Sequence, residues 1–243
     1  MSFRLRCFLL HLLISLGLAF VSVSIVFGFW YPPPIHKAVG ATAIFLLLLA
    51  VDVVLGPLLT FILAVQGKKY LSFDFSVVAL LQISAFLYGL YVVAEGRAVW
   101  LVFNVDRFDL VQAYQVNEKY RQDAIPKYQS LSWTGPKLVS AQQPKEPDAH
   151  SRLVFESVKN GIDLPQRPDL YTAYEDEKAN IVSSALELTE LNRFNSKERV
   201  IEILKKWPEA DAYLPMMSRT NPMVVLINRH TIKVIATVEL SPW

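Results

Sequence analysis

The chain has 243 residues, of which 53% are hydrophobic and only 19% charged, whereas charged residues make up about a quarter of an ordinary soluble domain. The apolar residues gather in three runs, residues 7–31, 37–68 and 75–94, and each run is long enough to cross a hydrocarbon core about 30 Å thick. This composition excludes a soluble cytoplasmic enzyme. The net charge of +2 lies entirely in residues 1–96, and the balanced remainder leaves no electrostatic footprint for nucleic acid.

The hydropathy pattern predicts three transmembrane helices, at about residues 7–29, 39–66 and 75–94. The first follows Arg4 and Arg6, as in a secretory signal peptide, but its apolar core is longer than the roughly 7–15 residues of such a peptide. We therefore expect it to remain as an anchor. It ends in aromatic residues typical of the membrane interface and in a triple proline that cannot continue a helix.

Basic residues at the ends of the spans favour a cytoplasmic N-terminus, because cytoplasmic loops carry an excess of lysine and arginine. Arg4, Arg6, Lys68 and Lys69 fall on one side of the expected membrane, and Lys37 and Arg97 fall on the other. Three spans then place residues 97–243 outside. In a Gram-negative bacterium this means an inner-membrane protein with a periplasmic C-terminal domain.

Residues 1–96 are thus expected to form the transmembrane region, and residues 97–243 predict an α+β domain. β-rich runs occur at residues 98–105, 223–228 and 232–240, and the last two are typical of a hairpin with one buried face. Helices are expected at residues 153–158, stopped by Gly161, at 174–191, and from an N-cap at Ser196 to Pro208. Proline, glycine and polar residues at 134–148 predict a loop.

Asp52 stands out because it is the only charged residue within the second predicted span. A carboxyl group there costs roughly 2.5–3.5 kcal/mol to insert, so it should face other helices or a polar cavity. Pro57 lies five residues on and cannot donate to the carbonyl of Val53, which predicts a kinked, locally polar segment. Thr60 is expected to bond back to the carbonyl of Gly56.

Three interpretations of Asp52 stay open. Its carboxyl group could be protonated and hydrogen bonded within the bundle, to Ser22, Ser24 or Tyr88, which lie at a matching depth. It could instead contact a polar group on the transmembrane helix of a partner. A proton or ion pathway is the third interpretation, and three spans with few polar residues argue against it.

No pattern of catalytic or ligand-binding residues is present. The four histidines have no metal-ligand spacing, and the sequence has neither a G-x-S-x-G elbow nor a glycine-rich phosphate loop. The acidic residues 175–177 lack the alternating oxygen ligands of a calcium loop and are typical of a solvated helix start. We expect a protein that is not an enzyme and that binds neither a metal nor a cofactor.

Several strings resemble the TfpX/TfpZ family of type IV pilin accessory proteins. They are VDVVLGPLLT at residues 51–60, KKYLSFDFSVVALLQ at 68–82, Tyr88–Gly89, and VFNVDRFDLV at 102–111. The resemblance implies an inner-membrane protein encoded with a particular major pilin, which assists assembly of that pilin without enzymatic activity or a cofactor. Its partners would be the cognate type IV major pilin, the lipid bilayer and the pilus assembly machinery.

Such a protein could hold the pilin in the membrane in the manner of a chaperone. Asp52 and Pro57 are then candidate intramembrane contacts, and Asp106, Arg107 and Asp109, shortly after the third span, are candidate contacts for the pilin head. The simpler alternative is that Arg107 pairs with an acid for structural reasons. Two other functions are a periplasmic ligand sensor, weakened by the short inner segments, and a membrane enzyme that modifies pilin.

Overall fold

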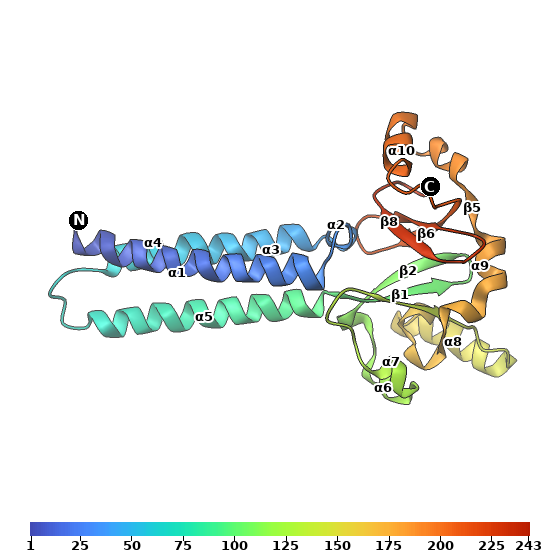
Figure 1. Ribbon diagram of the computed structural model, residues 1–243. Coiled ribbons are helices and arrows are strands. Elements are labelled where there is room, and N and C mark those ends of the chain that lie inside the picture. The colour runs from blue at the N-terminus through green and yellow to red at the C-terminus, as the bar shows by residue number, and fades with distance from the viewer. The chain divides into compact units, whose positions relative to one another are not determined.

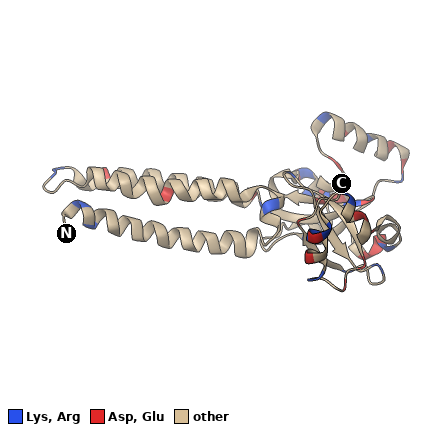
Figure 2. Cartoon of the chain, turned by 90° about the horizontal axis from the view of Figure 1, so that it is seen from above, with Lys and Arg blue, Asp and Glu red and all other residues tan.

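The computed structural model describes all residues from Met1 to Trp243, and the chain divides into two compact units (Figure 1). The first consists of Met1–Pro32 and Ala41–Glu95, and we call it the membrane unit. The second consists of Pro33–Gly40 and Gly96–Trp243, and we call it the C-terminal domain. Charged residues are sparse along the helices of the membrane unit and frequent in the C-terminal domain (Figure 2).

The membrane unit contains three helices that are long and apolar enough to cross a bilayer, as the sequence predicts. The first is α1, Phe3–Ile25, continued by a π-helical turn at Val26–Trp30. The second joins α3, Ala41–Ala50, through a π-helical turn at Val51–Leu55 to α4, Gly56–Leu63. The third is α5, Leu71–Glu95. With the α+β domain that follows, this confirms the expected fold class.

Helices α1 and α5 both pack against the second span, and small residues let α5 approach it closely. A Cβ atom at Gly56 would lie 2.2 Å from the side-chain oxygen of Gln82, and one at Gly89 would lie 2.2 Å from a methyl group of Leu48. A larger residue at either position would force the side chain of Gln82 or of Leu48 to move. The two glycines therefore make room for these side chains where the second and third spans meet.

The loop between the first two spans belongs to the C-terminal domain. It contains the short helix α2, Ile35–Ala38. Lys37 forms an ion pair of 2.8 Å with Glu239, and the side chain of Asn221 donates to the carbonyl of Lys37 at 2.8 Å. Backbone N–H groups of Thr220 and Asn221 donate to the carbonyl of Ala38. These bonds tie the loop, which the sequence analysis counted with the transmembrane region, to residues near the C-terminus.

The C-terminal domain is built on one mixed sheet in the order β4-β3-β1-β2-β6-β7-β8, with β5 paired to β6 (Figure 1). The pairs β1–β3 and β2–β6 are parallel, and the other pairs are antiparallel. The strands are β1 Ala98–Asn104, β2 Arg107–Gln112, β3 Lys137–Ala141, β4 Tyr171–Thr172, β5 Leu186–Glu187, β6 Ala212–Met217, β7 Met223–Ile227 and β8 Val234–Val238.

Helices cover this sheet over two hydrophobic clusters. One cluster lies around Trp100, whose ring meets those of Tyr128 and Tyr171 edge to face at 6.0 and 5.5 Å. The other gathers residues of β6, β7 and β8 against Val200 of α10. Besides α2, the α-helices of the domain are α6 Glu118–Asp123, α7 Pro126–Gln129, α8 Pro147–Asn160, α9 Lys178–Ser184 and α10 Lys197–Leu204.

Several local predictions are confirmed, and others are wrong. Strand β1, the hairpin β7–β8 and the helix stop at Gly161, which has φ 65°, are as expected. The loop expected at residues 134–148 contains β3, because residues 137–140 pair in parallel with β1. The helix expected at 174–191 ends at Ser184, because Leu186 pairs with Tyr213 of β6. Helix α10 begins after Ser196 at the N-cap, as expected, although the serine side chain makes no cap bond, and it ends at Leu204, short of Pro208.

Candidate functional site

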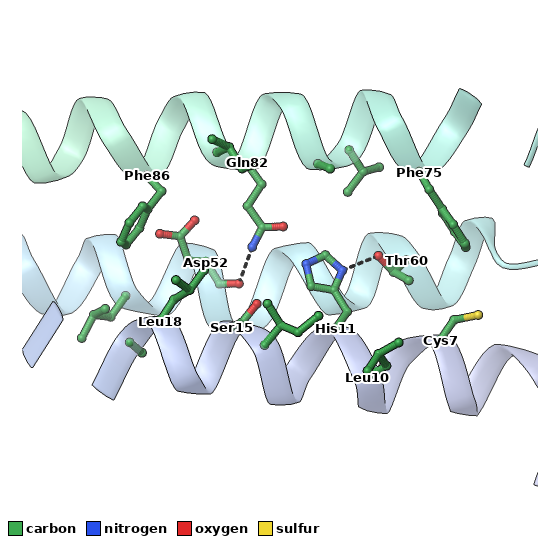
Figure 3. Close-up of a pocket in the computed structure, with 16 residues that line it drawn as sticks. Cys7, Leu10, His11, Ser15, Leu18, Asp52, Thr60, Phe75, Gln82 and Phe86 are labelled. Atoms are coloured by element: carbon green, nitrogen blue, oxygen red, sulfur yellow. Dashed lines mark hydrogen bonds between the residues drawn. The ribbon is translucent and has the colours of Figure 1, made fainter. Parts of the chain in front are cut away.

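A groove of about 390 Å³ runs along the membrane unit and is lined by residues from all three spans (Figure 3). Its walls are mostly apolar, and its polar residues come from every span: His11 and Ser15 from α1, Asp52 and Thr60 from the second span, and Gln82 from α5. From the sequence, Asp52 was singled out with Thr60 and with Ser22, Ser24 and Tyr88 as partners. The structure gathers polar residues of all three spans on one groove.

Asp52 lies in the π-helical turn Val51–Leu55, directly before Gly56 and Pro57. The proline cannot donate to the carbonyl one turn earlier, and a wider π turn is a common way to accommodate such a missing bond inside a helix. The irregular segment expected at this position is therefore present. Asp52 is only 7% exposed, and its Oδ2 atom has no hydrogen-bond partner.

Gln82 of α5 provides the polar contact across the bundle at this depth. Its Nε2 donates to the backbone carbonyl oxygen of Asp52 at 3.0 Å, as Figure 3 shows. The bond satisfies a backbone acceptor within the irregular turn. The side-chain oxygen of Gln82 is buried and has no partner, and it lies where only Gly56 leaves room for it. Two buried oxygens without a hydrogen-bond donor therefore occur among the groove residues, one on Asp52 and one on Gln82.

His11 links the first span to the second. Its Nδ1 and the Thr60 hydroxyl oxygen lie 2.6 Å apart and share a hydrogen bond (Figure 3). Thr60 was expected to bond back to the carbonyl of Gly56, and that prediction is wrong: its hydroxyl group bonds to His11 instead. Neither Gln82 nor His11 was predicted to have a role, although His11 is the only histidine within the first span.

The partners expected for the carboxyl group of Asp52 are a second correction. No hydrogen bond joins Asp52 to Ser22, Ser24 or Tyr88. Ser24 instead donates to the carbonyl of Phe20 within its own helix, and Tyr88 is 70% exposed on the outside of α5. The rotation of α5, which depth matching does not supply, turns Gln82 toward Asp52 and Tyr88 outward, whereas Ser22 is buried but makes no bond to the carboxyl group.

The second group of candidate residues lies at the hairpin between β1 and β2. Val105 has φ 61°, and the N–H of Asp106 donates to the carbonyl of Asn104 at 2.8 Å, which defines a γ-turn. Asp106 is exposed at this turn. Arg107 lies 3.4 Å from Asp109, which also accepts a hydrogen bond of 2.9 Å from Asn104. Burial raises the pKa of Asp109, and its two partners oppose that shift.

Asp106 and Arg107 also line a cavity of about 370 Å³ between this hairpin and α8, together with His150. Asp109 does not line it. The three residues proposed as one contact therefore separate into two that face a cavity and one that is paired behind them. No group of three histidine, cysteine or acidic side chains is placed to hold a metal ion.

Comparison with known proteins assigns the family. The chain is 30% identical to the fimbrial assembly protein of serogroup I from Dichelobacter nodosus over 242 residues, which cover 96% of this chain and 94% of that protein. The chain belongs to the fimbrial assembly protein family. A second relative in the family, the serogroup E1 protein of the same organism, is 28% identical over 242 residues and is covered to 94% of its length.

Two further comparisons agree with this assignment. The fimbrial assembly protein of serogroups C1 and C2 from the same organism is 41% identical over 99 residues, 40% of this chain and 76% of that protein. The family model described as fimbrial assembly protein FimB matches residues 1–40, which contain the first span and most of the loop after it. No solved structure matches the chain.

Proposed function

We propose that this protein is an inner-membrane accessory factor of the TfpX/TfpZ type that assists assembly of a cognate type IV pilin. The observation that carries the proposal is the 30% identity to a fimbrial assembly protein over almost the whole length of both chains. Because the similarity extends beyond the spans, it includes the C-terminal domain, and both parts are expected to contribute. The proposed role is binding and positioning of the pilin subunit, as a chaperone would, rather than covalent chemistry.

The geometry of the membrane unit supports a binding role. A pilin subunit that waits in the bilayer offers a hydrophobic helix and an external head. The groove among the spans presents an apolar surface with a few polar groups inside the membrane, which suits a helix. The C-terminal domain offers a separate surface for a head, and the loop Pro33–Gly40 adds to that domain.

Deletion of the gene tests this proposal directly. We expect loss of surface pili, with pilin still synthesised, and recovery when the full chain is supplied in trans. A chaperone role further predicts that a cross-linker in the membrane captures pilin together with this protein. Normal piliation in the deletion strain would contradict the proposal, and sugar or another group missing from purified pilin would favour a modifying enzyme instead.

The proposed orientation places the N-terminus in the cytoplasm and the C-terminal domain in the periplasm. A reporter that is active only in the periplasm should give signal when fused after Trp243 and none when fused after Lys69. The reverse pattern would overturn the orientation, and with it the proposed location of the domain that meets the pilin head.

A further inference from the structure

The lining of the membrane groove has the spacing of a helix-packing seam. On α1 the lining residues are Cys7, Leu10, His11, Ile14, Ser15, Leu18 and Ala19, and on α5 they are Phe75, Val78, Ala79, Gln82, Ile83 and Phe86. Both rows repeat every three to four residues, which is the spacing that faces a neighbouring helix. The seam on α1 covers three turns, about 18 Å at 1.5 Å per residue.

The groove is bounded by α1 on one side and α5 on the other, and the second span lies at its base. In Figure 3 the lining residues of α1 and α5 point toward the second span, which lies between the two helices, and Cys7 and Phe75 lie at the same end of the groove. Helices α1 and α5 therefore run in the same direction on either side of the groove. A fourth helix placed there would pack against both walls over about three turns.

Two residues that line the groove, Asp52 and Gln82, each have a side-chain oxygen that accepts no hydrogen bond. Oδ2 of Asp52 and Oε1 of Gln82 are both buried without a hydrogen-bond partner. An unsatisfied polar atom inside a membrane is costly, and no water is available in the hydrocarbon core to satisfy it. The acyl chain of a lipid fills an apolar groove but has no donor at this depth, so lipid leaves the two oxygens unpaired.

We propose that the groove binds a transmembrane helix of a partner protein that carries a hydrogen-bond donor, a hydroxyl, amide or ammonium group, at the depth of Asp52 and Gln82. The apolar walls hold the helix, and the carboxyl group of Asp52, which lines the groove and is 7% exposed, selects its donor. The assignment of this helix to the pilin subunit rests on the proposed function. The binding site itself rests on the geometry of the groove.

A model helix tests the site separately from pilus assembly. The full chain, reconstituted in bilayer nanodiscs, is mixed with a fluorescent 20-residue leucine–alanine helix that has one asparagine at its centre, and binding is read by energy transfer. We expect the asparagine helix to bind roughly three- to twenty-fold more tightly than its all-leucine counterpart, as expected for one hydrogen bond inside a membrane. Equal binding of the two helices would overturn the proposal.

Variants of the chain separate the acceptor from the groove. Asp52→Leu should abolish the preference for asparagine and leave the all-leucine helix unaffected, and Asp52→Asn should retain the preference because its amide oxygen still accepts. Ile83→Trp should block both helices, because Ile83 lines the groove yet is 56% exposed and tolerates a larger side chain. Leu80→Trp is the matched control, since Leu80 is 67% exposed on the same helix and lies outside the groove.

Two results would contradict the inference even if the protein proves essential for piliation. Unchanged binding in Ile83→Trp would show that the groove is not the site. Association of two copies of this chain that is lost in Ile83→Trp would assign the groove to self-association instead. Conversely, donor-selective binding in a protein whose deletion leaves piliation normal would support the groove and reject the proposed function.

Discussion

In the C-terminal domain, the partly buried guanidinium group of Arg167 has several hydrogen-bond partners, whereas in the membrane unit an oxygen of the buried carboxyl group of Asp52 has none. Arg167 donates two hydrogen bonds to Asp169, at 2.9 and 2.7 Å, and one to Glu156 at 2.8 Å. Its guanidinium also lies 3.6 Å from the centre of the Tyr120 ring. Oδ2 of Asp52, by contrast, is buried and has no hydrogen-bond partner.

This difference distinguishes a polar group that stabilises the fold from one that is available to bind a partner. A charge that serves folding is stable only when its own chain satisfies it, because an unpaired buried charge costs several kcal/mol. A group reserved for a partner must lack an internal competitor. Arg167 fits the first case and Asp52 the second, so substitutions of the two residues should have opposite consequences for stability and for binding.

Arg167→Leu is expected to give the largest change in stability. The substitution leaves Glu156 and Asp169 close together without their shared counter-charge, so the free energy of unfolding of the C-terminal domain should fall by about 3 kcal/mol. Arg167→Lys should recover only part of this loss, because lysine cannot form the two parallel bonds to Asp169. Proteolysis of the full chain in detergent, measured across a urea series, checks the order of the three proteins.

If Arg167→Leu lowers the free energy of unfolding no more than substitution of an exposed arginine does, Arg167 is not a structural residue. Arg193→Leu is a suitable control, since Arg193 is largely exposed and pairs only with Glu190 three residues earlier. Exposed pairs of this kind contribute between zero and about 1 kcal/mol.

In the membrane unit, the effects on stability of substituting Thr60 and Asp52 can be compared. Thr60→Val keeps the shape of the side chain and removes the bond to His11, so it should lower stability by about 0.6 kcal/mol and at most roughly 1.7 kcal/mol. Asp52→Leu removes no side-chain hydrogen bond and takes a carboxyl group out of the membrane interior, so it should leave stability unchanged or raise it. Thermal unfolding in detergent, followed by helical circular dichroism, measures both.

Asp52→Leu should nevertheless impair piliation if its carboxyl group is reserved for a partner. A variant that folds as well as the wild type and fails in assembly would sharpen the contrast with Arg167. A variant with strongly reduced stability would instead show that Asp52 is a structural residue.

The sequence was sufficient to identify Asp52 and Pro57 as special, because a charge and a helix breaker stand out within an apolar run. It was not sufficient to find the partners of that segment. Gln82, rather than Ser22 or Tyr88, contacts Asp52 because of how α5 is rotated and because Gly56 leaves space. Hydropathy records the depth of a residue and not the direction in which its side chain points.

Strands that depend on pairing with distant residues were likewise not predicted from the sequence. The long β-rich run at β1 and the hairpin β7–β8 carry their own pattern, so they were predicted. Strand β3 is short and lies among proline and glycine residues, and it becomes a strand only by pairing with β1. Strand β6 contains Pro215, and a proline argues against a strand that has neighbours on both edges. In the structure β6 is nevertheless a strand, and Pro215 lies opposite Val224 of β7.

Asp109 allows a pH test within the C-terminal domain. Burial raises the pKa of this carboxyl group, so the folded state binds its proton more readily than the unfolded state. The free energy of unfolding should therefore fall as the pH rises from about 4, the ordinary value for aspartate, through the raised value. Asp109→Asn should remove this part of the pH dependence and still accept the bond from Asn104. Urea unfolding at several pH values compares the slopes, and an unchanged slope in the variant would contradict the assignment.

The smallest expected effect concerns the γ-turn at Val105, beside the cavity that Asp106 and Arg107 line. A branched side chain at φ 61° is strained by roughly 1–2 kcal/mol, whereas glycine adopts this conformation freely at an entropic cost of about 0.5–1 kcal/mol. Val105→Gly should therefore be neutral or stabilising, by no more than about 1 kcal/mol. The same substitution at Val234, in the extended strand β8, should destabilise the domain by about 1 kcal/mol because no strain is relieved there. Equal losses at the two positions would show that the turn is unstrained. Opposite signs would show that the backbone is strained at Val105, directly before the two residues Asp106 and Arg107 that line the cavity.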